Sequence, residues 1–267
     1  MLTAYFDRNV FDQIDRKLNL TDKEIAALRR AVSKGRLTVL ISFEVVQETA
    51  YAAPDKALSG LRLIKELCRE NLPIKSHNEL LRDDIESFAK GTKPPQPFIW
   101  GEFNVDSVIC DVKNQTPEFL KMVADDKRNR DELNAKLIAH INEERQALGA
   151  KRPASYQKYW EMRASYYAES FAHFAGYLEE CRSHGIDNLL QVRSVRLAVA
   201  AWLSLFYSLL IEGRVVKRGT SRDIQHAAPM AAADIVVTND MELLRLLKRV
   251  PINDFKVVSP HELLKLI

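Results

Sequence analysis

The hydrophobic and polar positions of the chain follow two patterns that alternate along its two ends. Short apolar or β-branched runs at residues 2–6, 36–42, 234–240 and 255–260 predict strands, and the run at 72–75 is a weaker candidate for another. The segments between them have helical periodicity, at 21–35, 43–53, 58–71, 223–233, 241–250 and 261–267. Thr21 and Glu24 have the spacing of a capping box, and Ser42 can cap the helix that follows it. Strands that alternate with helices predict an α/β domain with a central parallel sheet.

The middle of the chain breaks this alternation. Three prolines within 94–97 exclude a regular helix there, and two long helical patterns follow, at 117–148 and 156–183. We therefore predict an α/β core formed by residues 1–76 and 194–267, with residues 77–193 as a large all-helical insertion. The aromatic stripe from Tyr156 to Phe174 predicts a core face, with His173 on it as a core histidine. The two long helices are expected to pack as a hairpin against the apolar segment 197–211, with Phe98 and Trp100 exposed in the loop before them.

Composition and charge leave the function open. The 267 residues are 46% hydrophobic and 28% charged, which is typical of a folded domain, and the net charge of +3 does not indicate a nucleic-acid-binding protein. Three separated cysteines form no CxxC pair, so neither a zinc knuckle nor a disulfide framework is predicted. The apolar run 197–211 would span only about 22 Å as a helix, short of the ~30 Å of a bilayer core. Because the N-terminus also lacks the order of a signal peptide, we expect a cytoplasmic protein that does not act at a membrane.

Four carboxylates from distant parts of the chain stand where a parallel sheet would bring them together. Ligands collect beyond the carboxyl ends of parallel strands. Asp7 ends the first predicted strand and Asp240 ends the strand IVVTND, while Glu48 lies on the helix after the second strand and Asp223 begins a later helix. Glu44 shares a helix face with Glu48 and is the alternative to it. Asp234 begins its strand, at the wrong end for catalysis, and is predicted to be structural.

Such a group of acids predicts a divalent metal site. Like charges raise one another's pKa, and a hard cation relieves the repulsion. Oxygen ligands without a His or Cys cluster favour Mg²⁺ or Mn²⁺ over zinc. One or two ions of this kind activate water and stabilise the charge that develops on a phosphate, so phosphodiester cleavage is the predicted chemistry.

Three segments, FDRNVF, ISFEVVQET and SRDIQHAAPMAAADIVVTND, resemble the signatures of the PIN-domain family in the family's order. The resemblance covers residues 1–70 and 215–267 and implies a three-layer α/β/α fold with metal-dependent ribonuclease activity, in some members as a toxin. It selects Asp7, Glu48, Asp223 and Asp240 as the acidic set. It also implies supporting roles for polar positions beside them, which are Asn9, Ser42, Thr238 and Asn239. Arg8 departs from the family, in which Thr or Ser often follows the first Asp, and it puts substrate geometry and metal affinity in question.

Other readings stay open. His226, about one helical turn after Asp223, is a candidate for substrate contact. A PIN-like module that has lost cleavage could act through its helical insertion, by binding a protein partner or a second copy of itself. A phosphatase of the haloacid-dehalogenase type also places Asp at the end of its first strand, but it usually has a second Asp where this chain has Asn9, and no later Lys motif can be identified.

Overall fold

A four-stranded parallel sheet organises the two ends of the chain in this computed structural model, which describes all residues except 69–72, 100–103, 150–152, 216–219 and 250–255. The strands are β1 (Leu2–Phe6), β2 (Leu37–Leu40), β3 (Ile235–Val237) and β4 (Lys256–Val258), in the order β2-β1-β3-β4. β1 pairs with β2 on one side and with β3 on the other, all in parallel. The N-terminal strand therefore lies beside a strand from the last third of the chain, as the predicted parallel sheet requires.

Helices make up most of the remaining structure. Those in the N-terminal part are α1 (Arg8–Arg16), α2 (Asp22–Ser33), α3 (Phe43–Ala50) and α4 (Pro54–Cys68). The middle contains α5 (His77–Ala89), α6 (Val105–Asn114), α7 (Pro117–Leu148), α8 (Tyr156–Ala175), α9 (Leu178–His184) and α10 (Ile186–Leu189). The C-terminal part contains α11 (Arg193–Leu210), α12 (Thr220–Gln225), α13 (Ala227–Met230), α14 (Met241–Lys248) and α15 (Pro260–Leu264). The α/β prediction therefore holds, although the chain is mostly helical and its sheet is small.

Local capping explains where several helices begin. Thr21 and Glu24 form both hydrogen bonds of the predicted capping box, and the Ser42 side chain accepts from the backbone N–H of Val45. α4 begins earlier than predicted, at Pro54, because proline is well suited to the first turn of a helix. The candidate strand at 72–75 is reduced to isolated bridges from Ile74 to Ser42 and to Phe98.

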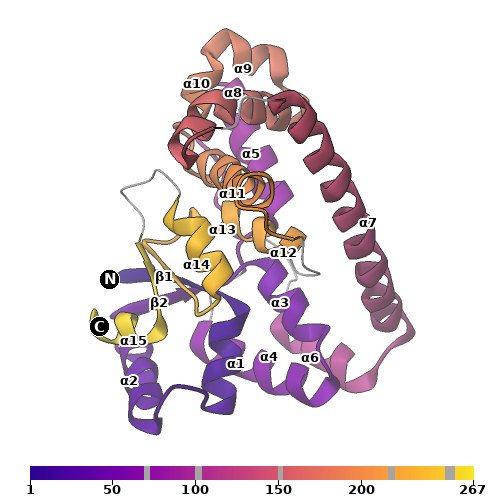
Figure 1. Ribbon diagram of the computed structural model, residues 1–267. Helices are drawn as coiled ribbons and strands as arrows, with labels where there is room; N and C mark the ends of the chain where they lie inside the picture. Colours follow the sequence, from indigo (N-terminus) through magenta and orange to yellow (C-terminus); the bar gives the residue numbers. More distant parts are fainter. Residues whose placement is uncertain (69–72, 100–103, 150–152, 216–219, 250–255) are drawn as a thin grey trace.

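The middle of the chain differs from the predicted hairpin. α7 has the predicted bounds, but α8 ends before Gly176, whose φ of 83° lies in the left-handed region, and a separate α9 follows. α5 and α6 were not predicted, although Ser76 and Glu79 form a capping box at the start of α5. Figure 1 shows α7 along one flank of the molecule, from α6 at its first turn to α8 at its last. α7 and α8 are therefore not a side-by-side hairpin, whereas α8 does pack on α11 as predicted.

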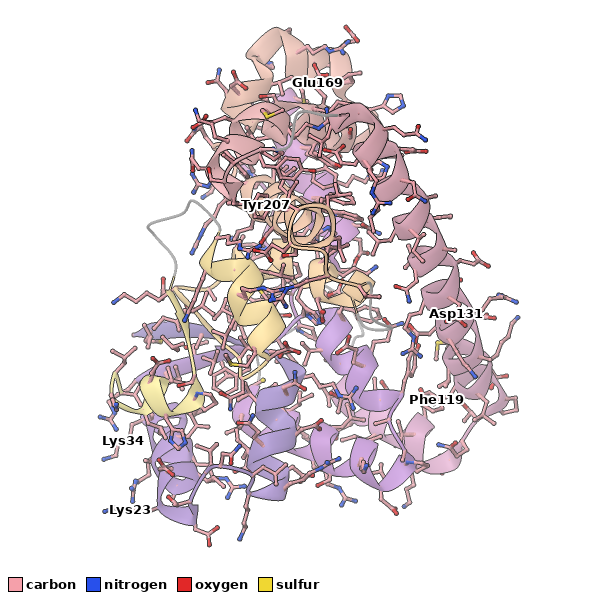
Figure 2. All side chains as sticks on the ribbon, in the orientation of Figure 1. Lys23, Lys34, Phe119, Asp131, Glu169 and Tyr207 are labelled. Atoms are coloured by element: carbon pink, nitrogen blue, oxygen red, sulfur yellow. The ribbon has the colours of Figure 1, made fainter. Side chains whose placement is uncertain are left out.

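The two ends of α7 are fixed to different parts of the protein. Phe119, labelled in Figure 2, lies near the first turn of α7. The ring centroid of Phe119 is 5.9 Å from that of Tyr51 at the end of α3. Near its last turn, Glu144 is 2% exposed and accepts two hydrogen bonds from Arg163 on α8. α7 thus connects the α/β part to the helices around α8.

The aromatic stripe of α8 is only partly a core face. Tyr159 and Tyr167 are buried against the other helices, as predicted. Phe174 is 84% exposed and His173 is exposed as well, so the prediction that both belong to the core was wrong. Phe174 is exposed because its ring lines an open cleft. Phe98 is half-buried, and Trp100 lies outside the described residues.

Among the described helices, α11 has the length and hydropathy needed to cross a membrane. However, 72% of its 18 residues are buried inside the protein, where it contacts α8, α13 and α14. This is the pattern of the buried core helix that was predicted, although α11 is longer than the apolar run within 197–211 on which the length argument rested.

Candidate active site

Asp7 sits at the carboxyl end of β1, where it is 5% exposed. Its backbone N–H donates to the carbonyl of Val237, the last residue of β3, and it precedes the first turn of α1. Its Oδ2 accepts hydrogen bonds from the Thr238 hydroxyl at 2.9 Å and from the Asn9 amide at 3.2 Å. Two of the predicted supporting residues therefore hold this carboxylate in place.

Asp240 is joined to Asp7 through Thr238. The Thr238 hydroxyl oxygen accepts from the Asp240 backbone N–H at 2.9 Å while donating to Asp7. Asp240 Oδ1 accepts from the backbone N–H of Leu243 at 3.1 Å, which makes it the cap of α14. The next residue back, Asn239, donates to the side chain of Gln13 on α1. The loop after β3 is thus tied to the loop after β1.

Glu48 projects from α3 toward His226. Its Oε1 lies 3.5 Å from His226 Nε2, and its side chain is 11% exposed. The other ring nitrogen of His226 lies 2.7 Å from the Tyr5 hydroxyl, which is itself 2.9 Å from the Ser42 hydroxyl. His226 is 3% exposed and lies between Glu48 and Tyr5, so it can orient the Glu48 carboxylate. Its contact with substrate stays a prediction.

Electrostatic coupling links Asp223 to the other three acids. Burial raises the pKa of Asp223 to about 7, with repulsion from Asp240, Asp7 and Glu48 adding to the shift and His226 opposing it. Asp223 lies on α12, which contacts both α7 and α11. The sequence-selected acids therefore lie within electrostatic range of one another.

The same coupling appears at Asp7 and His226. Burial raises the pKa of Asp7, His226 opposes the shift, and Glu48 and Asp240 strengthen it. For His226, burial disfavours the charged form, but Glu48 and Asp7 outweigh burial and raise the pKa to about 9. At neutral pH, a protonated His226 supplies a buried positive charge that partly balances the acids.

Glu44, the alternative to Glu48, faces another environment. Its Oε1 accepts from the backbone N–H of His77 at 2.7 Å, and it is 7% exposed. Its Oε2 has no hydrogen-bond partner among the described residues. Burial raises the pKa of Glu44, with the His77 hydrogen bond opposing the shift. Glu44 thus contributes to the buried surroundings of His226, whereas Glu48 contacts that residue directly.

Two residues that the sequence reasoning missed complete the site. Tyr5 is fully buried within β1, and its hydroxyl joins Ser42 to His226. A tyrosine within a buried strand needs a hydrogen-bond partner, and this requirement is the signal that could have identified it. Gln13 had no comparable signal.

Arg8 and Asp234 make other contacts. Arg8 turns toward Asp12 on its own helix, with 3.9 Å between Nε and Oδ2. Asp234, at the opposite end of β3, accepts two hydrogen bonds from Thr3.

The carboxylate oxygens of the candidate site are donors of the type that a divalent cation such as Mg²⁺ prefers. Within the described part of the chain, no three His, Cys, Asp or Glu side chains converge as a ready-made metal cage. Mg²⁺ usually keeps several waters and takes only one or two carboxylates directly, so it does not need such a cage. Mutually repelling, buried carboxylates with raised pKa are the donors that such an ion would suit.

Comparisons with known proteins add no relative. No protein-family model, curated protein or solved structure matches this chain.

Proposed function

We propose that this protein is a metal-dependent phosphodiesterase that cleaves RNA, a ribonuclease of the PIN-domain type with a three-layer α/β/α core. The observation that carries the proposal is the junction of Asp7 and Asp240 through the Thr238 hydroxyl, beyond the carboxyl ends of the paired strands β1 and β3. These are the strand ends at which ligands of parallel sheets collect. Asp223 on α12 is close enough for repulsion from both to add to the rise of its pKa. The order of the three sequence segments supports the same family.

The acids would hold Mg²⁺ or Mn²⁺, which supplies an activated water and positive charge at the phosphate when bound. The surrounding residues fix the donors before any ligand arrives. Thr238 and Asn9 orient Asp7, and His226 orients Glu48. Such pre-positioning is the main contribution that a protein makes to chemistry of this kind.

The direct test is cleavage of a labelled single-stranded RNA by the full chain. We expect cleavage with Mn²⁺ or Mg²⁺ and none with excess EDTA. Asp223→Asn should reduce the rate at least about 100-fold, because it removes a ligand charge from the site. Asp131→Asn is the matched control, since Asp131 is exposed on α7 at the flank of the molecule (Figure 2). Metal-independent cleavage, or equal rates for the two variants, would overturn the proposal.

A second candidate is a PIN-like module that binds RNA or a protein without cleaving it. The contact between His226 and Glu48 favours it, because an imidazolium beside a carboxylate competes with a metal ion for that ligand. The same assay separates the two functions, since a binding module would leave the RNA intact under every metal condition.

A further inference from the structure

A cleft of about 540 Å³ opens where the helices of the middle segment meet α11 and α12. Its walls come from five helices, α5, α7, α8, α11 and α12, with lining residues between positions 77 and 225. The volume lies within the range of ordinary small-ligand pockets. None of the carboxylates of the candidate active site lines it.

Aromatic rings line one part of this cleft. Phe171 and Phe174 come from α8, and Trp202 comes from α11. Phe206 stacks on Trp202, with ring centroids 5.5 Å apart and an interplanar angle of 27°, so the indole is held from one side. Phe174 is 84% exposed, so its ring is accessible to a ligand that enters the cleft. Rings of this kind form stacking platforms for flat heterocycles, whatever the identity of the base.

Polar groups at the cleft match the other parts of a nucleotide. Asn78 on α5 and Gln225 on α12 carry amides, which both donate and accept hydrogen bonds and can therefore pair with a base edge. Arg82 on α5 carries a positive charge suited to phosphate. No acidic residue stands among the described residues that line the cleft, so its charge is complementary to an anionic strand.

α12 connects this cleft to the carboxylates. Ile224 and Gln225 line the cleft, and Asp223, one residue earlier, belongs to the coupled acids. Successive residues of a helix rise by only ~1.5 Å but are rotated by about 100°, so Asp223 and Gln225 face different sides of the same turn. A strand that bends around α12 could therefore place one nucleotide in the cleft and a neighbouring phosphate near the acids.

The geometry points to a nucleobase-binding subsite in this cleft, in which Phe174 and Trp202 stack on a base of the RNA strand whose phosphate reaches the carboxylates. The inference rests on the proposed function for its substrate class. An apolar peptide is the alternative occupant, but the amides, Arg82 and the absence of acidic lining residues in the described part favour the base.

The test measures binding without cleavage, with the full chain in EDTA. Fluorescence anisotropy would compare a short labelled RNA with a strand of the same length that carries abasic sites. We expect tighter binding of the strand with bases. Phe174→Ala should weaken that binding at least about fivefold and leave the abasic strand unaffected, because stacking on one ring is lost. Phe174→Trp should restore it.

Tyr166→Ala is the matched control, since Tyr166 is an exposed aromatic on the same helix but outside the cleft. Thermal unfolding of each variant would confirm that it folds. Equal binding of the two strands, an unchanged Phe174→Ala variant, or an absence of RNA binding would overturn the subsite. The subsite would also be overturned if an apolar dye bound to the cleft at Phe174 and RNA failed to displace it. A base-dependent affinity in a protein that cleaves nothing would instead overturn the nuclease proposal and leave the subsite standing.

Discussion

His226 Nε2 lies 3.5 Å from Glu48 Oε1 inside the protein, with the opposite ring nitrogen 2.7 Å from the Tyr5 hydroxyl. The imidazole therefore lies between a strand residue and a helix carboxylate. Its charge opposes the burial and the repulsion that together raise the pKa of both Asp7 and Asp223. The metal-free site depends on this residue for its charge balance.

His226→Gln should therefore destabilise the metal-free protein by about 1–3 kcal/mol at pH 7, because a buried charge and a hydrogen-bond partner of Tyr5 are altered together. Urea unfolding in EDTA measures the change. His173→Gln, at an exposed histidine of α8, is the control and should leave the free energy of unfolding unchanged. Equal stability of the two variants would contradict the role assigned to His226.

Asp7→Asn should separate stability from activity. The amide oxygen can still accept from Thr238, while a buried carboxylate whose raised pKa reflects an unfavourable charge is removed. We expect the metal-free variant to unfold at the wild-type temperature or above it, and to cleave RNA at least about 100-fold more slowly. A variant that unfolds earlier and retains full cleavage would show that Asp7 has a structural role only.

The buried His77 predicts a pH dependence of stability. Burial, with repulsion from His226, lowers the pKa of His77 to about 4. Between pH 4 and about pH 6.5, His77 binds a proton more readily in the unfolded chain than in the folded one. The free energy of unfolding is therefore highest above this window, and it falls as the pH falls through the window. At pH 4 this loss of unfolding free energy is about 3 kcal/mol. Urea unfolding from pH 4.5 to 7.5 should show a shallower slope for His77→Gln, and parallel slopes would be inconsistent with a buried neutral histidine.

Glu144 provides a test of how α7 is held to α8. It accepts hydrogen bonds from Arg163 and from the Tyr159 hydroxyl at 2.6 Å, and it is 2% exposed. Glu144→Ala leaves Arg163 without its buried partner, so we expect a loss of about 3–5 kcal/mol in unfolding free energy. Glu143→Ala, on the exposed side of the same turn, should cost less than about 1 kcal/mol. A similar small effect for both would mean that the packing of α7 does not depend on this ion pair.

The sequence predicted the parts of the fold that local patterns specify. Short apolar runs identified all four strands, and the capping residues Thr21 and Ser42 lie at the helix starts where they were predicted. The arrangement of α7 could not be predicted from local patterns, because it depends on tertiary contacts of Phe119 with Tyr51 and of Glu144 with Arg163. Phe174 was misassigned for a related reason, since helical periodicity identifies a face but not what covers it.

At the candidate site, the rule that ligands collect at strand ends selected Asp7 and Asp240 from their sequence positions. It could not reveal that Thr238 joins the two through one hydroxyl, nor that Tyr5 reaches His226. Both links join residues more than two hundred positions apart, and the first is set by the pairing of β1 with β3.

Mn²⁺ binding, followed by electron paramagnetic resonance, shows whether the acids at the ends of β1 and β3 hold a metal ion, since free and bound ions give different signals. We predict saturable binding to the wild-type protein, strong weakening in both Asp7→Asn and Asp240→Asn, and wild-type binding in Asp131→Asn. Loss in both variants would follow from a site shared by the ends of β1 and β3. Undiminished Mn²⁺ binding in Asp7→Asn and Asp240→Asn, or no binding to the wild-type protein, would contradict it.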